Sequence, residues 1–225
     1  LIIVMSVMNG FRTELINKIV GFNSHITVKP YNKSINIDEV NSKNLELISQ
    51  NLILSNSSEA IILGEQSSKG VILRGYLKKD FSKLELMNNE NFIGNNKNLE
   101  KNFISIGKEL SFNLDLEIGD GVTIMSSAGV ETIIGNLPKQ RTFIVSSIFD
   151  SGLADFDNNV IFLNLNTLES FSNLSEDDRN LEIYLKNPKK IENQKKIVQN
   201  IFLNDLVFTW ADMNKSLFSA LKVER

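Results

Sequence analysis

The sequence of 225 residues contains no cysteine and only one histidine. The absence of cysteine excludes disulfide bonds, thiolate nucleophiles and zinc–thiolate sites together, and it fits a periplasmic and a cytosolic location equally well. The single histidine, His25, lies on the polar face of an expected strand beside Thr27. Because few residues offer it an acid–base partner, we interpret His25 as a surface residue of that strand.

Three motifs that carry common chemistry are also missing. The sequence has no G-x-S-x-G element for a serine hydrolase. Gly107-Lys108 is not part of a phosphate-binding P-loop, because Asn102 occupies the position of the upstream glycine. The acidic run that begins at Asp155 is not an EF-hand, because Val160 replaces its glycine and Asn166 its bidentate glutamate. We therefore expect no catalytic residue, no metal site and no cofactor.

Charge gives no reason to expect a nucleic-acid partner. The chain has 24 basic and 27 acidic residues, for a formal net charge of −3. The lysine pairs at 189–190 and 195–196 are diluted by Glu192 and are typical of the solvated face of a helix. Hydrophobic residues make up 42% of the chain, which is typical of a globular protein with a sizeable core.

Both ends of the chain carry apolar helical patterns. An apolar start at Leu1–Met5 continues as Val7, Met8 and Phe11, so it is about half as long as the ~20 residues that span a membrane. One apolar stripe then runs from Phe11 to Val20. We expect residues 1–23 to be the outer end of a first transmembrane helix with its stalk, and residues 210–225 to be a stalk helix leading into a second. The alternative is a buried N-terminal helix of a soluble domain.

Between these ends, the hydrophobic periodicity predicts an α+β fold. The expected strands are 24–31, 60–63, 71–77, 117–125, 142–149, 159–165, 181–185 and 206–209, and the expected helices are 37–51, 106–114, 168–171 and 188–202. The last strand–helix–strand portion mirrors the first. The economical architecture is therefore a discontinuous β-α-β subdomain (24–85 and 179–209) interrupted by a β-rich subdomain (86–178).

The segment Ser126–Arg141 is long and apolar for a connection between two strands. Hairpin loops usually have about 2–5 residues. The apolar residues here are Val130, Ile133, Ile134 and Leu137. Exposed apolar groups at a protruding tip are typical of a surface that binds another protein. The glycines at 129 and 135, placed as hinges would be, favour this interpretation over a loop folded back onto its own sheet.

Four segments carry a family resemblance. They are Ser6–Phe11; Ile106–Leu110 with Leu116 and Gly119-Asp120; Phe149–Asp157 with the strand after it; and Trp210–Asn214 with Leu217–Leu221 and Glu224-Arg225. In this order, and over essentially the whole chain, they resemble the LolC/LolE permeases of the lipoprotein-releasing ABC transporter.

The resemblance implies a non-catalytic permease subunit of the bacterial inner membrane, with this segment mostly in the periplasm. Such permeases pair as two subunits over a cytoplasmic ATPase, extract acylated lipoproteins from the membrane and pass them to a periplasmic lipoprotein chaperone. Their periplasmic region is a MacB-like domain, in which a porter-like α+β part is interrupted by a β-rich part. Stalk helices would transmit the motion driven by ATP to the periplasmic side.

In the LolC branch a protruding hairpin, the hook, captures the chaperone with help from a polar pad. The segment 126–141 resembles this hook. The chaperone-binding residues implied are Ile133, Ile134, Leu137, Pro138, Gln140 and Arg141, and the implied lipoprotein contacts are Met8 and Phe11. Gln140 and Arg141 would belong to the pad and donate hydrogen bonds to carboxylates and carbonyls of the chaperone.

The sequence departs from the pattern of that branch at three positions. Thr123 stands where a second pad arginine is expected, and Ile133-Ile134 replace the usual Pro-Met pair of the hook. These departures weaken the match to the LolC branch; LolC is still preferred to LolE, with a combined single-gene form as an alternative.

Two other functions stay open. A MacB/FtsX-like permease for export or for activation of cell-wall hydrolases would share the mechanical architecture but lack a chaperone-binding hook. An autonomous periplasmic enzyme would need a pocket with paired titratable groups, for which the sequence offers no convincing candidates.

Overall fold

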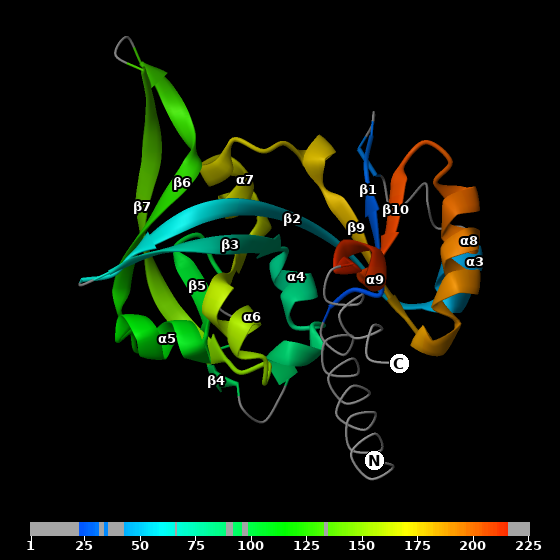
Figure 1. The fold of residues 1–225 in the computed structure, drawn as a ribbon, viewed down its shortest axis with the longest axis horizontal. Coiled ribbons are helices and arrows are strands. Elements are labelled where there is room, and N and C mark those ends of the chain that lie inside the picture. Colours follow the sequence, from blue (N-terminus) through cyan, green and yellow to red (C-terminus); the bar gives the residue numbers. More distant parts are fainter. Residues whose placement is uncertain are drawn as a thin grey trace, which may run out of the picture. The chain divides into compact units, whose positions relative to one another are not determined.

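A computed structural model gives the fold of the chain (Figure 1). It describes residues 23–31, 34–35, 43–65, 67–88, 92–95, 99–132 and 135–215. The chain forms two compact units: a split unit of residues 1–52 and 180–225, and an inserted unit of residues 53–179. The fold is thus α+β and discontinuous, with one unit inserted in the other's sequence, as the sequence predicts.

The split unit is built around a short antiparallel sheet. Its strands are β1 (Ile26–Lys29) in the middle, β10 (Leu206–Thr209) on one side and β9 (Asn180–Leu185) on the other. Its helices are α3 (Lys43–Ile48), α8 (Ile191–Ile201) and α9 (Trp210–Met213), with the 3-10 turn η3 (Pro188–Lys190) ahead of α8. Ile26 and Val28 alternate along β1 and are completely buried, so one face of this sheet supplies the core.

The other face of β1 is buried as well, which corrects the interpretation of His25 as a surface residue. His25 is only 8% exposed. Its Nδ1 accepts a hydrogen bond from the backbone N–H of Leu185 at 2.8 Å, and burial lowers its pKa. The alternation of a strand shows which residues share a face, but not whether another part of the chain covers that face.

Side-chain caps define the helices at the end of the split unit. Asn187 accepts a hydrogen bond from the backbone N–H of Lys189 at 3.2 Å, with Pro188 at the first turn, as expected for a helix start. Thr209 and Asp212 form a capping box at the start of α9. Lys195 of α8 donates to Asp212 at 2.7 Å, which joins the two helices.

The inserted unit contains a closed ring of six strands. They are β2 (Ser49–Leu63, which enters this unit at Ile53), β3 (Ser68–Tyr76), β8 (Val160–Asn164), β5 (Phe103–Gly107), β7 (Gly135–Phe149) and β6 (Gly121–Thr132). Each strand pairs with the next in this order, and β6 pairs with β2. A short strand, β4 (Ile93–Gly94), adds to the end of β7. A closed ring satisfies the strand edges internally, as in a small barrel.

Alternate residues of these strands fill the barrel. The fully buried ones include Ile62, Leu73, Ile104, Ile106, Ile124, Phe143, Val145, Ile161 and Leu163. Helices α4 (Lys78–Phe81), α5 (Lys108–Leu114), α6 (Ala154–Asn159) and α7 (Leu165–Ser172) and the turns η1 (Glu85–Asn88) and η2 (Glu176–Asp178) belong to the same unit. Phe162 projects from β8 between the rings of Phe149 and Phe81, at centroid distances of 5.0 and 6.1 Å, so both faces of β8 are packed.

The first boundary between the units lies at residues 52/53, whereas the sequence placed it at 85/86. The sequence pattern predicts that β2 and β3 belong to the same subdomain as β1. In the structure β3 pairs in parallel with β8, and β2 pairs with β6, so both are walls of the barrel. The expected helix 37–51 is also shorter at its end, because α3 stops at Ile48 and β2 follows directly.

Within the described residues, no helix is both long enough and apolar enough to span a membrane. The expected segment 1–20 and most of 210–225 lie outside the described residues, and α9 covers only Trp210–Met213 of the latter.

Candidate functional site

The segment 126–141 is a β-hairpin rather than a long loop. Strand β6 continues to Thr132 and β7 begins at Gly135, so only residues 133–134 connect them. The pairing of β2 with β6 ends at Ser126, whereas β6 and β7 stay paired from Gly129 to Thr132. Beyond the barrel the two strands therefore form a two-stranded ribbon, visible in green at the upper left of Figure 1.

A bulge marks the point where this ribbon leaves the barrel. Four steps along β6, from Met125 to Gly129, face two steps along β7, from Gln140 to Pro138. The extra residues are held locally, since Ser127 donates to the carbonyl oxygen of Glu59 at 3.1 Å. A bulge bends its strand and increases the twist, so it turns the ribbon away from the barrel wall.

The predicted hook residues are only partly placed. Ile133 and Ile134 lie outside the described residues, as do Met8 and Phe11. Leu137 is 51% exposed on the ribbon, and Pro138 beside it is exposed. The ribbon therefore presents at least one large apolar side chain to solvent.

The structure separates the predicted contact residues onto two faces of β7. Leu137 and Arg141 share the face of the buried Phe143, whereas Pro138 and Gln140 share the opposite face, because strand side chains alternate. Gln140 Nε2 lies 3.7 Å from Met125 Sδ on that opposite face. A flat partner would contact only one of these sets, whereas a partner that encloses the ribbon would contact both.

Arg141 borders a polar groove. Its guanidinium donates to Asn102 Oδ1 and lies 5.3 Å from the ring centre of Phe143. The groove has a volume of about 720 Å³ and is lined by Lys78, Leu99, Glu100, Lys101, Asn102, Phe103, Arg141, Asn164, Asn166, Thr167 and Ser170. Lys78 pairs with Glu100 at 2.8 Å and lowers the pKa of that carboxyl.

The described lining of the groove carries three cations, Lys78, Lys101 and Arg141, and one carboxylate, that of Glu100. Among the described residues, no carboxylate lies within ion-pair distance of Arg141 or Lys101, and the rest of the lining combines amides and hydroxyls with Leu99 and Phe103. The site can therefore accept carboxylate or carbonyl oxygens. Sequence reasoning found Arg141 but missed Lys78, Lys101 and Asn102, because nothing in their spacing shows that β5, α4 and β7 meet here.

Thr123 lies on the opposite face, with Gln140. Its hydroxyl is 3.2 Å from that of Thr142, its cross-strand partner. The threonine found in place of the expected second pad arginine therefore leaves that face without a cation at this row.

Two of the segments that carry the family resemblance contact each other. Lys108 pairs with Asp150 at 3.0 Å, and the backbone of Asp157 lies directly against Gly107. Both carboxylate oxygens of Asp157 accept from the backbone N–H of Ser151, at 3.0 and 3.1 Å, and burial raises the pKa of Asp157 to about 6. These residues close a structural corner between α5 and α6.

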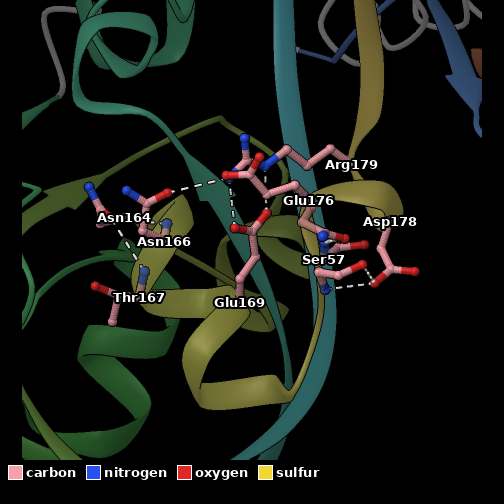
Figure 2. A network of polar contacts seen from close by, with 10 residues as sticks. Ser57, Asn164, Asn166, Thr167, Glu169, Glu176, Asp178 and Arg179 are labelled. Atoms are coloured by element: carbon pink, nitrogen blue, oxygen red, sulfur yellow. Dashed lines mark hydrogen bonds and ion pairs between the residues drawn. The ribbon is translucent and has the colours of Figure 1, made fainter. Parts of the chain in front are cut away.

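A salt-bridge network that sequence reasoning missed fastens α7 (Figure 2). Arg179 donates to both oxygens of Glu169, at 2.7 and 2.8 Å, and also to Glu176 at 3.1 Å. The first pair is largely buried, and Ser175 and Asp178 cap the turn η2 between them. Ten residues separate Arg179 from Glu169, so no helical spacing signals the pair.

Acidic side chains occur around a second pocket of about 470 Å³, which is lined in part by Asp115 and Asp120. Asp120 already accepts from the backbone N–H of Glu117 at 2.7 Å. Across the described ranges, no group of three or more side chains is arranged to hold a metal ion.

Comparison with curated proteins finds sequences that are similar over the whole of this chain. It is 28% identical over 231 residues to the lipoprotein-releasing system transmembrane protein LolC of Buchnera aphidicola subsp. Acyrthosiphon pisum, covering all of this chain and 56% of that protein. It is 24% identical to LolC of Xylella fastidiosa (strain Temecula1) and of Neisseria meningitidis serogroup B, again over the whole chain and 55% and 56% of those proteins. The resemblance to the LolC/LolE permeases is thereby confirmed, and the chain spans a little over half the length of these relatives.

No family model matches the chain. Among solved structures, the periplasmic region of MacB from Actinobacillus actinomycetemcomitans is similar over 88% of this chain and 94% of its own, with a TM-score of 0.46 and 9% identity. The extracellular domain of the transporter YknZ from Gram-positive bacteria is similar over 81% of this chain and all of its own, with a TM-score of 0.43 and 10% identity.

Proposed function

We propose that this chain is the periplasmic part of an inner-membrane ABC-type permease that releases outer-membrane lipoproteins and transfers them to a periplasmic chaperone. Similarity over the whole of this chain to LolC proteins from three bacterial genera supports this proposal. The observation that carries it is the two-stranded ribbon at 129–138, since a projecting ribbon with an exposed leucine suits the capture of another protein.

In this proposal the ribbon and the groove act together. The apolar end, with Ile133, Ile134, Leu137 and Pro138, enters a concave apolar surface of the chaperone. Gln140 and Arg141 donate hydrogen bonds from the two faces at the base of the ribbon, and Arg141 is supported by the cationic groove. A chaperone that encloses the ribbon makes use of both faces.

The remaining partners follow from the same proposal. A second permease subunit and a cytoplasmic ATPase complete the transporter, and the present chain performs no catalysis. Met8 and Phe11 contact the acylated lipoprotein near the membrane. The segments 11–20 and 213–221, whose sequence patterns predict stalk helices, would transmit motion driven by ATP hydrolysis to the periplasm.

The binding role is tested by an acidic substitution on the ribbon. Leu137→Asp places a charge in the apolar contact, so the affinity for the lipoprotein chaperone of the same bacterium should fall at least about tenfold. Leu203→Asp is the matched control, because Leu203 is 79% exposed in the split unit and has no proposed role. Titration calorimetry with both purified proteins measures the two affinities.

The outcomes separate the candidate functions. Strong binding by the unsubstituted chain that Leu137→Asp alone weakens supports chaperone capture at the ribbon. Equal loss with both variants, or none with either, rejects the ribbon as the site. No binding by the unsubstituted chain favours a MacB/FtsX-like permease that transmits motion without a chaperone.

A further inference from the structure

We propose that Asn173 is a positioning residue that locks the base of the ribbon to helix α7 and so presets the ribbon for its partner. Asn173 is the C-terminal cap of α7 and contacts both strands. Its Nδ2 donates to the carbonyl oxygen of Gly129 on β6 at 3.2 Å, and its Oδ1 accepts from Lys139 of β7. The lock itself does not depend on the proposed function of the ribbon. Only its expected effect on chaperone binding rests on that function.

The amide orientation of Asn173 fits both neighbours. A carbonyl oxygen needs a donor and an ammonium needs an acceptor, so the amide group satisfies the two strands with its two ends, and the flipped orientation would satisfy neither. Lys139 also donates to the carbonyl oxygen of Ser170 at 3.0 Å. This places its charge at the C-terminal end of α7, where the helix dipole favours a cation.

Helix α7 is a fixed support for this contact. Its Leu165 and Leu168 pack against Gly75 of β3, where an added Cβ would lie 2.8 Å from Leu168 Cδ2. Phe171 contacts the ring of Phe143 edge-on at 5.7 Å, and Glu169 is held by Arg179. Each contact joins α7 to a different part of the inserted unit. The helix is therefore held in place, and so is the side chain of its C-terminal cap, Asn173.

The position of the contact determines what it does. Gly129 is the first residue of β6 to pair with β7 after the bulge, and β2 no longer pairs with β6 there. At that point the ribbon has lost the support of the barrel, and a two-stranded ribbon alone is marginally stable in water. The backbone of Asn173 has φ 55°, a left-handed conformation that asparagine and glycine adopt readily. Asparagine therefore both ends the helix and anchors the ribbon.

Hydrogen exchange in the full chain tests the lock without any partner. Asn173→Gly keeps the left-handed backbone but removes both side-chain contacts, so the backbone amides of residues 129–132 and 135–137 should exchange about tenfold faster. Amides of β5 and β8 that exchange through local fluctuations should not change, and the free energy of unfolding should fall by no more than about 1.4 kcal/mol, the equivalent of that tenfold change. Asn158→Ala, which removes a different surface amide contact, at 3.0 Å from Asn113, should leave the ribbon unaffected.

Two further variants test the same contact if Asn173→Gly folds poorly. Asn173→Asp retains the acceptor for Lys139 but cannot donate to Gly129, so its exchange rates should be intermediate. Lys139→Met keeps the aliphatic stem, and its effect should be strongly non-additive with that of Asn173→Gly, because both substitutions break the same contact. Unchanged exchange in the ribbon for all three variants overturns the lock.

Binding measurements then separate this inference from the proposed function. Because a two-stranded ribbon without this support is marginally stable, unlocked orientations should become a large part of the population in Asn173→Gly. Chaperone affinity should then fall in proportion to the lost competent fraction, although no contact residue is altered. Faster exchange with undiminished affinity rejects the positioning role. Absence of chaperone binding by the unsubstituted chain counts against the proposed function. The hydrogen-exchange rates then remain the test of the contact between Asn173 and the ribbon.

Discussion

Gly107 shows how a single residue constrains the inserted unit. An added Cβ there would lie 2.0 Å from the carbonyl oxygen of Asp157, far inside van der Waals contact with a backbone atom. The segments Ile106–Leu110 and Phe149–Asp157 meet at this point.

Gly107→Ala should therefore destabilise the chain by about 3 kcal/mol or prevent folding, because backbone on both sides must move. Gly70→Ala is the control, since an added Cβ at Gly70 meets no atom within 4 Å and the substitution should be neutral or slightly stabilising. Urea unfolding gives both free energies. Equal stability of the two variants would contradict the close contact.

The titration of Asp157 should make the free energy of unfolding depend measurably on pH. Burial raises its pKa from 3.8 to about 6, so the folded state favours the protonated carboxyl. The stability linked to that proton is complete below the unfolded pKa and is lost as the pH rises through about 6. Asp157→Asn keeps an acceptor for Ser151 but cannot titrate. Between pH 4 and pH 7 the unsubstituted chain should lose about 2 kcal/mol more stability than Asp157→Asn.

Urea unfolding of both proteins at the two pH values measures this difference. The many other groups that titrate in this range contribute to both proteins alike, so they largely cancel. Parallel pH profiles for the two proteins would show that Asp157 titrates normally when folded.

Helix α7 is the element on which the ribbon depends. It packs on β3 and β7, accepts the ion pair from Arg179 and carries the cap that reaches the ribbon. The sequence predicted a short helix at 168–171 in this place, and α7 extends from Leu165 to Ser172. Asn164 begins it by accepting from the backbone N–H of Asn166 and of Thr167, so the capping residue lies four residues before the predicted helix start at 168.

Breaking the buried pair on this helix should be costly. Arg179→Met leaves the buried carboxylate of Glu169 without its partner, so stability should fall by about 3 kcal/mol. Replacing both residues, with Glu169→Leu and Arg179→Met, should recover most of that loss because no buried charge remains. Glu176→Gln removes the exposed partner of the same arginine and should cost less than about 1 kcal/mol. A double-mutant cycle in urea measures the coupling, and additive losses would exclude it.

Local elements were the predictable part of this fold. Strands β1, β9 and β10 and helices α5 and α8 follow from hydrophobic periodicity and capping residues, each close to its expected range. The hairpin at 126–141 was expected, but its strands were ended too early. In residues 130–137, apolar and polar residues do not alternate clearly, so the sequence pattern is typical of a loop. The backbone nevertheless stays paired almost to the tip.

Closure of the barrel could not be read from the sequence. Parallel pairing of β3 with β8 joins segments almost ninety residues apart, Ile72 with Val160 for example, and periodicity carries no information about such partners. The same limit hid the groove beside Arg141, whose walls come from four separate segments. Family resemblance supplied Arg141 and Gln140, but only the register of β7 shows that they face opposite ways.

For the molecule as a whole, the account rests on the ribbon as the part that meets a chaperone. The register allows it to be removed cleanly: residues 130–137 can be replaced by Asn-Gly, which joins Gly129 to Pro138 through a two-residue turn and leaves the barrel pairing unchanged. Calorimetric titration of this shortened chain with the periplasmic lipoprotein chaperone is the most direct test. We predict at least about a hundredfold loss of affinity with an unchanged urea midpoint. Undiminished binding by the shortened, folded chain would contradict the account.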